Sequence, residues 1–257
     1  MAFFKAVFNK IFRLFKNLIV FIFSNIIRFK RFGINSHNLN SVEITTIKQG
    51  YETKPPSREI LSFVANITSQ YFSAKINLPS DQNSVWDIYN NGYVNDHYRL
   101  LAIITKTIDP KQIVEIGTFR GASTKTFLLN SSAKIITYDL ISWLEFKPTY
   151  LEQDDFKQAQ IVQKLENVLE NKEKFKKDLL SSQLLFIDGP KNFTFEKELF
   201  SYINEIKNEI KKLYIIVDDT KVSTMVDIWS GINIDKIDLS FIGHWSGTGL
   251  ILINNEN

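Results

Sequence analysis

Acidic side chains lie at the ends of four short apolar runs in the second half of the chain. The run "QIVEIG" carries Glu115, "KIITYDL" carries Asp139, "LLFIDG" carries Asp188, and "LYIIVDD" ends at Asp218 and Asp219. Short apolar runs of this kind are typical of buried strands. In an open parallel sheet the carboxyl ends of the strands lie at one edge, where ligands bind. The four runs therefore predict a single acidic rim beside a ligand site.

Two of the ten glycines of the chain, Gly117 and Gly121, follow the first of these runs. A ligand that lies against the backbone needs residues without a Cβ atom at that point. The loop reads "GTFRGAST", and it does not match the G-x-G-x-x-G fingerprint of dinucleotide-binding folds. Glu115 beside this loop is unfavourable for a phosphate, whereas it suits a cationic or amino-bearing ligand. The missing fingerprint counts against a nucleotide-dependent oxidoreductase.

The elements that would position these residues can be predicted from the periodicity of the chain. From residue 112 on, short apolar runs alternate with longer amphipathic ones, which predicts strands alternating with helices. This alternation predicts an α/β fold, a doubly wound and mostly parallel sheet with helices on both faces. The apolar character of the runs fits a sheet covered on both sides. The last part, 237–253, reads as a hairpin around Ser246–Gly249.

The helices are predicted from longer amphipathic stretches. Residues 154–175 and 193–212 each predict a long helix, and residues 59–109 predict two or three helical pieces that Pro110 closes. The third strand of the sheet is not located by its pattern, and 175–183 is the segment that could contain it.

The ordered motifs resemble those of a known family. "VEIGTFRGAST" is similar to the first motif of class I S-adenosylmethionine-dependent methyltransferases, in the catechol and macrocin O-methyltransferase-like branches. "ITYDL", "LLFIDGPKNF", "YIIVDDT" and "GTGLILI" continue the resemblance, which covers about residues 90–254. It implies a Rossmann-like methyltransferase sheet. It also implies an O-methyltransferase that acts on a hydroxyl of a glycan or secondary-metabolite acceptor, with S-adenosyl-L-methionine as cofactor.

The resemblance also implies residue roles. It assigns Asp139 to the ribose hydroxyls of the cofactor, and Lys191, together with Asp188, to catalysis, with Lys191 as the general base. A solvated loop lysine is the alternative for Lys191, and a simple strand-end turn is the alternative for Asp139. The residues that match the cofactor loop and the ribose acid are Glu115, Gly117, Thr118, Gly121, Ser123 and Asp139.

The resemblance further implies a magnesium site. Asp188, Asp218 and Asp219 match the oxygen ligands of the metal-dependent members, which usually show Asp and Asp-Asn where this chain has Asp and Asp-Asp. Three carboxylates from two strand ends suit Mg²⁺, which prefers hard oxygen ligands. Two further side chains have open roles: His97 either overhangs the site or lies on the surface, and Trp245 either reaches the substrate or belongs to the core.

The first 42 residues carry seven Lys/Arg and no Asp/Glu, and the rest of the chain carries 24 Lys/Arg against 28 Asp/Glu. At helical spacing, residues 1–33 place Phe, Leu and Ile on one face and basic and polar residues on the other. The longest charge-free run, 17–27, is too short for a spanning helix, which needs about 20 apolar residues. The pattern favours a helix on an anionic membrane surface, and a helix docked on the domain is the alternative.

The predicted organisation is an amphipathic membrane-surface helix (1–33), a linker (34–58) and a methyltransferase domain (59–257), which comprises N-terminal helices (59–109) and a Rossmann-like core (110–257). The chain has no cysteine, so disulfides and thiolate metal sites are excluded. A mildly acidic body speaks against nucleic-acid binding. We expect a cytoplasmic protein peripheral at the membrane. The oligomeric state stays open, and a non-catalytic methyltransferase-like domain tethered to the membrane is the alternative function.

Overall fold

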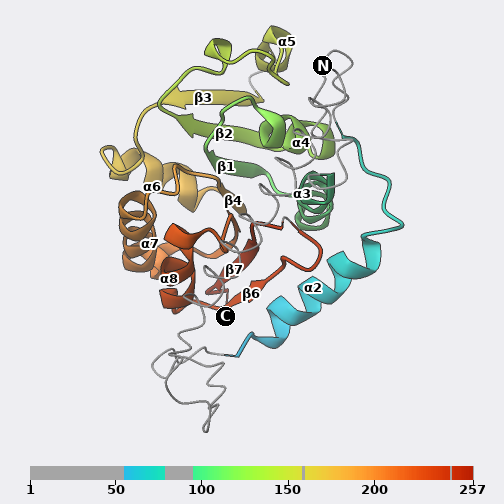
Figure 1. Ribbon diagram of the computed structural model, residues 1–257, viewed down its shortest axis with the longest axis vertical. Helices are drawn as coiled ribbons and strands as arrows, with labels where there is room; N and C mark the ends of the chain where they lie inside the picture. Colours follow the sequence, from blue (N-terminus) through green and yellow to red (C-terminus); the bar gives the residue numbers. More distant parts are fainter. Residues whose placement is uncertain (1–54, 79–94, 158–159, 244, 257) are drawn as a thin grey trace, which may run out of the picture. The chain divides into compact units, whose positions relative to one another are not determined.

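A seven-stranded sheet forms the centre of the computed structural model, which describes residues 55–78, 95–157, 160–243 and 245–256 (Figure 1). The strand order is β3-β2-β1-β4-β5-β7-β6. The strands are β1 (Gln112–Ile116), β2 (Lys134–Asp139), β3 (Ile161–Leu165), β4 (Leu184–Ile187), β5 (Lys212–Asp218), β6 (Lys236–Asp238) and β7 (Thr248–Asn254).

The first five strands are parallel, and the last two are not. β1 pairs in parallel with both β2 and β4, and β5 pairs in parallel with β4. β7 runs antiparallel to both β5 and β6. The strand order reverses between β1 and β4, and such a switch point is where open α/β sheets bind ligands. The predicted doubly wound, mostly parallel sheet is confirmed.

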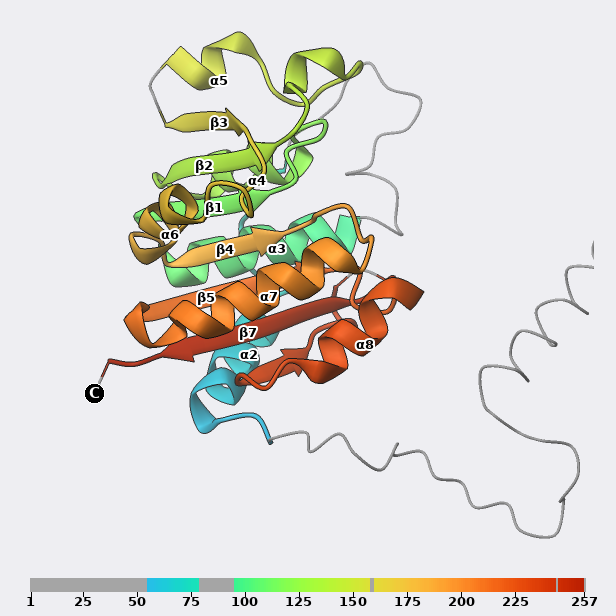
Figure 2. The same ribbon diagram turned by 90° about the vertical axis from the view of Figure 1, so that its left-hand side faces the viewer.

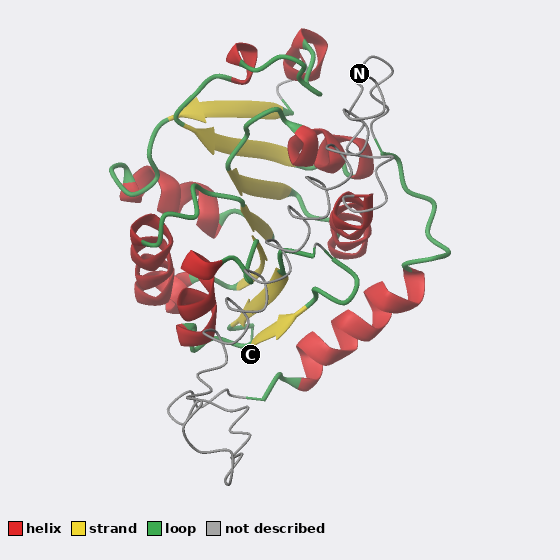
Figure 3. Cartoon of the chain, viewed as in Figure 1, coloured by secondary structure: helices red, strands yellow, loops and turns green. Residues whose placement is uncertain are grey.

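Helices cover both faces of this sheet (Figures 2 and 3). One face carries α2 (Arg58–Gln70), α3 (Asn95–Ile108) and α4 (Ala122–Asn130), and the other carries α6 (Lys172–Leu180), α7 (Thr194–Ile206) and α8 (Ser223–Gly231). Three short elements complete the described part of the fold, namely α5 (Gln153–Lys157) and the 3₁₀ helices Trp143–Glu145 and Lys207–Glu209.

Strand β5 shows why the sheet needs both layers. Leu213, Ile215 and Val217 belong to the core under α6, α7 and α8, whereas Tyr214 and Ile216 belong to the core under α2, α3 and α4. Successive side chains of a strand point to opposite faces, so an uninterrupted apolar run requires cover on both sides. The same alternation directs the next residue, Asp218, towards the α3 face.

Two sequence predictions about the third strand are wrong. The segment 154–175 is not one long helix, because β3 lies within it between α5 and α6. The segment 175–183 holds no strand and belongs largely to α6. β3 is an edge strand that pairs only with β2 among the described strands, and its middle residues are half-exposed. Its polar residues Gln163 and Lys164 therefore interrupt the apolar run that marks a buried strand.

The C-terminal hairpin is confirmed as the β6–β7 pair, although Thr248 and Gly249 belong to β7 itself and not to the turn. The predictions for residues 1–33 and for most of the linker 34–58 lie outside the described residues. The first described element is α2, which Ser57 caps by accepting a hydrogen bond from the Ile60 amide. Within the described part of the chain, no helix combines the length and apolar character that a membrane crossing requires.

Candidate active site

The loop after β1 lies at the switch point of the sheet, and both of its glycines are required by the backbone. Gly117 has a φ of 100°, and a Cβ atom there would lie 2.2 Å from the carbonyl oxygen of Asp188. Gly121, with a φ of 77°, precedes α4, and its Cβ atom would lie 2.3 Å from Cγ of Leu151. Left-handed conformations of this kind favour glycine. The observed reason for these glycines is thus backbone conformation and packing, whereas the sequence interpretation was contact with a ligand.

Glu115 lies fully buried beneath this loop. Its two carboxylate oxygens accept hydrogen bonds from the hydroxyls of Ser123 and Thr124, in the first turn of α4. Burial raises the pKa of the Glu115 carboxyl to about 7, and hydrogen bonds from Ser123, Thr124 and Thr137 limit the rise. Glu115 and Ser123, two of the predicted cofactor residues, therefore contact each other, and their bond ties the start of α4 to β1.

Asp139 ends β2 and organises the turn beside the loop. Its carboxylate accepts hydrogen bonds from the backbone amides of Phe119 at 2.8 Å, Leu140 at 2.7 Å and Ile141 at 3.1 Å. A carboxylate offers about four acceptor positions, so roughly one remains for a ligand hydroxyl. The structure thus places Asp139 in the strand-end turn, and its predicted ribose contact stays a prediction. Thr118, also predicted to bind the cofactor, has its hydroxyl 2.7 Å from that of Thr137.

The three aspartates predicted to bind metal lie together. Oxygen atoms of Asp188, Asp218 and Asp219 all lie within 4.8 Å of one another, at the adjacent carboxyl ends of β4 and β5. We call these three residues the carboxylate cluster. Asp218 is buried, whereas the other two side chains are partly exposed. The Ser246 hydroxyl donates a hydrogen bond to Asp219. This donor set consists of hard oxygen atoms, which suits a divalent cation such as Mg²⁺.

Lys191 places its ammonium among the carboxylates. Its Nζ lies 2.5 Å from Oδ1 of Asp188 and 3.4 Å from Oδ2 of Asp219, and the side chain is only 12% exposed. Its backbone amide donates to Glu196, and its carbonyl accepts from Thr224, so the backbone is held as well. Lys191 is therefore not a solvated loop lysine.

The charge state of Lys191 follows from these contacts. Burial alone would lower the pKa of the Lys191 ammonium, but the charge of Asp188 and the hydrogen bond to it, with Asp218 and Asp219 near, raise that pKa on balance. The amine is thus protonated in this arrangement. It can act as a general base only after it has released its own proton, so the predicted catalytic role depends on a change in these contacts.

His97 is a residue whose position the sequence left open. It is 4% exposed, and its Nδ1 lies 3.7 Å from Oδ1 of Asp218. The interpretation of a surface histidine is therefore wrong. Its spacing from Leu100, Leu101 and Ile104 was the available signal, because these residues share one face of a helix with it.

Two other residues also have clear positions. Trp245 is 75% exposed, so it is not a core residue, and its neighbour Ser246 contacts the carboxylate cluster. The Asp178 carboxylate accepts hydrogen bonds from Lys164 and from the Tyr138 hydroxyl, which gives Asp178 a structural role between α6 and the sheet. His244 lies outside the described residues.

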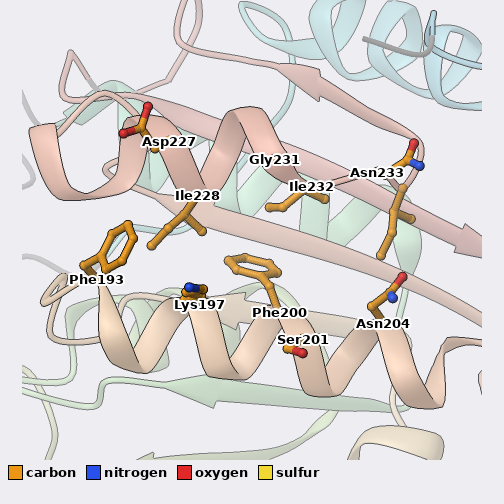
Figure 4. A pocket seen from close by; sticks show the side chains of 11 residues that line it. Phe193, Lys197, Phe200, Ser201, Asn204, Asp227, Ile228, Gly231, Ile232 and Asn233 are labelled. Carbon is orange, nitrogen blue, oxygen red and sulfur yellow. The ribbon is translucent and has the colours of Figure 1, made fainter. Parts of the chain in front are cut away.

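A separate hollow of about 380 Å³ lies between α7 and α8 (Figure 4). Phe200 and Ile228 contribute apolar surface to it, and Lys197 and Asp227 contribute charged groups. None of the predicted cofactor or metal residues lines this hollow. The predicted residues instead gather at the carboxyl ends of β1, β2, β4 and β5.

No protein-family model matches the chain, and no curated protein matches it. Three solved structures that resemble it are methyltransferases by name. A methyltransferase from Podospora anserina with bound SAH has 14% identity and a TM-score of 0.44, over 77% of this chain and 98% of that one. A Staphylococcus aureus protein assigned as a caffeoyl-CoA O-methyltransferase has 17% identity and a TM-score of 0.48, over 76% and 100%.

The third structure is a TDP-rhamnose 3′-O-methyltransferase of calicheamicin biosynthesis, with 11% identity and a TM-score of 0.45, over 76% of this chain and 95% of that one. Identities and TM-scores of this size show no family membership.

Proposed function

We propose that this chain is an S-adenosylmethionine-dependent O-methyltransferase, assisted by Mg²⁺, which acts on a hydroxyl of a glycan or secondary-metabolite acceptor. One observation carries the proposal. The glycine loop with Glu115 and Asp139 lies at the switch point of the sheet, directly beside the carboxylate cluster with Lys191. A group-transfer site requires a loop that binds the cofactor and, beside it, charged side chains that can act on the acceptor. Both lie here at one switch point.

The residues fit the cofactor in two respects. The amino group of S-adenosylmethionine is a cation, and the acidic rim beside the loop suits a cation better than a phosphate. Glu115 itself is fully buried and bonded to Ser123 and Thr124, so it would hold the loop in place and not contact the amino group. Asp139 keeps an acceptor position for a ribose hydroxyl in addition to its three amide bonds. The backbone of Gly117, Thr118, Gly121 and Ser123 would form the rest of the cradle, because the hydroxyls of Thr118 and Ser123 are bonded to Thr137 and Glu115. When bound, this cofactor supplies an activated methyl group on a sulfonium.

The carboxylate cluster fits the metal. Asp188, Asp218 and Asp219 would hold Mg²⁺, which supplies a positive charge that lowers the pKa of a nearby hydroxyl. The Lys191 ammonium now neutralises part of this cluster. Lys191 and a divalent cation would compete for Asp188 and Asp219, because both are cations that need the same oxygens.

The chain itself would position the acceptor and receive its proton. Lys191 Nζ donates a hydrogen bond to Asp188 Oδ1. Because the Lys191 amine is already protonated, the proton of the acceptor hydroxyl would pass to Asp188, or to Lys191 only after Lys191 had given its own proton to Asp188. The deprotonated acceptor oxygen would then be the nucleophile of the methyl transfer. Lys191→Ala should therefore lower kcat more than it weakens cofactor binding, because Lys191 lies beside the carboxylate cluster and not in the cofactor loop.

A transfer assay tests the proposal. Labelled S-adenosylmethionine is incubated with glycan and phenolic acceptors, and product is detected by mass. We expect transfer to one acceptor class, a loss of transfer in excess chelator, and its return with Mg²⁺ or Mn²⁺. Full transfer in excess chelator would remove the metal from the mechanism. The carboxylates would then remain as turn caps or substrate contacts.

A second function is favoured by the position of Lys191. Its ammonium compensates the carboxylate cluster without any metal, which also suits a methyltransferase-like domain that no longer performs catalysis. Such a domain, tethered at a membrane, would serve as a partner in an assembly. Binding of S-adenosylmethionine separates the two functions, because the non-catalytic domain has no need of it.

The location of the protein forms part of the proposal. Residues 1–33 carry seven Lys/Arg, no acid and many Phe, Leu and Ile residues at helical spacing. We propose that this segment lies on an anionic membrane surface, with the catalytic domain in the cytoplasm. A lipid-linked glycan is an acceptor that this location would favour.

A further inference from the structure

Helix α3 has a stripe of buried side chains along one face, and His97 lies at the end of this stripe that is next to the carboxylate cluster. Leu100, Leu101 and Ile104 of this stripe are fully buried against the sheet. His97 precedes them by three, four and seven positions, so it continues the same helix face. An apolar residue would complete the stripe, because a buried polar group is costly unless it has a polar partner. The position therefore suggests a specific polar role for the imidazole.

The sheet directs two side chains towards His97. Phe186 of β4 belongs to the core on the α3 face, and its ring centroid lies 5.9 Å from that of His97. Asp218 follows Val217 of β5, whose side chain lies on the opposite face, so the alternation points Asp218 to the α3 side. His97 Nδ1 and Asp218 Oδ1 lie 3.7 Å apart, and the two side chains are 5% and 9% exposed.

The other two carboxylates of the cluster have a different neighbour. Lys191 pairs with Asp188 and Asp219, whereas the closest approach of His97 within the cluster is to Asp218. His97 is not among the groups whose ligand atoms lie within 4.8 Å of one another, although histidine is a metal-ligand type. This placement fits a residue that contacts one of the metal-binding carboxylates better than it fits a residue that binds the metal itself.

We propose that His97 is a positioning residue that orients the Asp218 carboxylate for a divalent cation at the carboxylate cluster. The proposal rests on the metal site of the proposed function and extends it to a residue on α3. Residues behind the ligands of a metal fix their orientation, and substituting them typically weakens metal binding about 10–100-fold. The alternative is a packed core histidine, held by its ring contacts to Tyr98 and Phe186.

Three variants of the full-length chain separate these roles. His97→Phe keeps an aromatic ring against Tyr98 and Phe186 but removes the polar atom that faces Asp218. His97→Asn keeps a nitrogen close to the place of Nδ1 and removes the ring. His97→Gln has a similar polar group one bond further out, near the place of Nε2. A packing role predicts that Phe is the best replacement, whereas a positioning role predicts that Asn is.

The test is Mn²⁺ binding, measured by the loss of the electron paramagnetic resonance signal of free aqueous Mn²⁺. We expect the wild-type chain to bind one Mn²⁺ at this site and Asp218→Asn to bind it far more weakly. We expect His97→Phe and His97→Gln to weaken binding about 10–100-fold, and His97→Asn to stay close to wild type. Thermal unfolding without metal should rank the variants differently, with Phe the most stable.

The outcomes are distinct. Wild-type affinity in His97→Phe would overturn the positioning role while leaving the metal site intact, and so would equal weakening in the Asn and Gln variants. If His97→Phe does not fold, the comparison of Asn with Gln decides alone. An absence of Mn²⁺ binding by the wild-type chain would overturn the metal site of the proposed function and the role of His97 with it.

Discussion

Glu115 is a buried carboxyl whose protonation is coupled to folding. Its pKa is about 7 in the folded chain because burial disfavours the charged form, against an ordinary value of 4.5. The folded state therefore binds this proton more tightly than the unfolded state does. The contribution of Glu115 to stability is fully present below pH 4.5 and is lost as the pH rises through 7.

Glu115→Gln should remove this pH dependence. The amide is neutral at every pH and still offers hydrogen-bonding atoms to Ser123 and Thr124. Urea unfolding at pH 5 and pH 8 should show a larger loss of unfolding free energy in the wild type than in the variant. The difference should be on the order of a few kcal/mol. Equal losses in both proteins would mean that Glu115 does not titrate in this range.

Asp139 is the residue that we expect to bind the ribose hydroxyls of the cofactor. Asp139→Ala should weaken S-adenosylmethionine binding by roughly 1–3 kcal/mol, the cost of leaving polar groups unpaired. Asp139→Ala also removes the hydrogen-bond acceptor of the backbone amides of Phe119, Leu140 and Ile141. The free energy of unfolding of the variant without cofactor should therefore be measured in parallel. A loss of stability with unchanged affinity would leave Asp139 as a turn residue only.

At the scale of single residues, the sequence predicts where the acids and glycines lie, but it does not predict why the fold needs them there. Gly117 was expected to admit a ligand, and the structure shows a left-handed backbone against the Asp188 carbonyl. The sequence does not indicate the position of His97, because Asp218, the residue that it approaches, is remote in sequence. A contact of this kind depends on the packing of α3 across β4 and β5, which local periodicity does not contain.

At the scale of elements, the turn from β1 into α4 should depend strongly on Gly117. A Cβ atom there would meet backbone that cannot move easily, and the φ of 100° is strained for any L side chain. We expect Gly117→Ala to lower the free energy of unfolding by roughly 2–4 kcal/mol.

Gly231→Ala is the matched control for this change. Gly231 ends α8, and an added Cβ atom would have no neighbour within 4 Å. Urea unfolding of this variant should show unchanged stability or a gain of up to about 1 kcal/mol, because alanine restricts the unfolded chain. Equal effects of the two substitutions would contradict the strained turn at Gly117.

Apart from the C-terminal hairpin, the strands that the sequence predicted are those that are buried on both faces. β1, β2, β4 and β5 are almost entirely buried, and each reads as a continuous apolar run. The apolar pattern does not predict β3, because β3 lies at the edge of the sheet and is only partly buried. Only Ile161 of this strand is fully buried, and Gln163 and Lys164 are compatible with a helix as well.

At the scale of the whole molecule, the basic start of the chain predicts membrane binding. The apolar residues of 1–33 supply hydrophobic insertion, and the seven cations each add about 1 kcal/mol near an anionic surface, a part that salt screens. Full-length protein should therefore float with anionic liposomes and be partly released at high salt.

A chain that starts at Asn35 is the control for flotation, and it should stay at the bottom of the gradient. Equal flotation of both proteins, or flotation of neither, would contradict an anchor in residues 1–33. A tag placed ahead of Met1 that becomes protected from protease would instead show that the segment crosses the membrane.

The central claim concerns the ligand at the switch point between β1 and β4, and calorimetric titration of the full-length chain with S-adenosylmethionine tests it most directly. We predict one binding site of micromolar order, in the presence and in the absence of Mg²⁺, and no binding of NAD, since the loop lacks the dinucleotide fingerprint. Absence of S-adenosylmethionine binding under both conditions, or binding of NAD in its place, would contradict the claim.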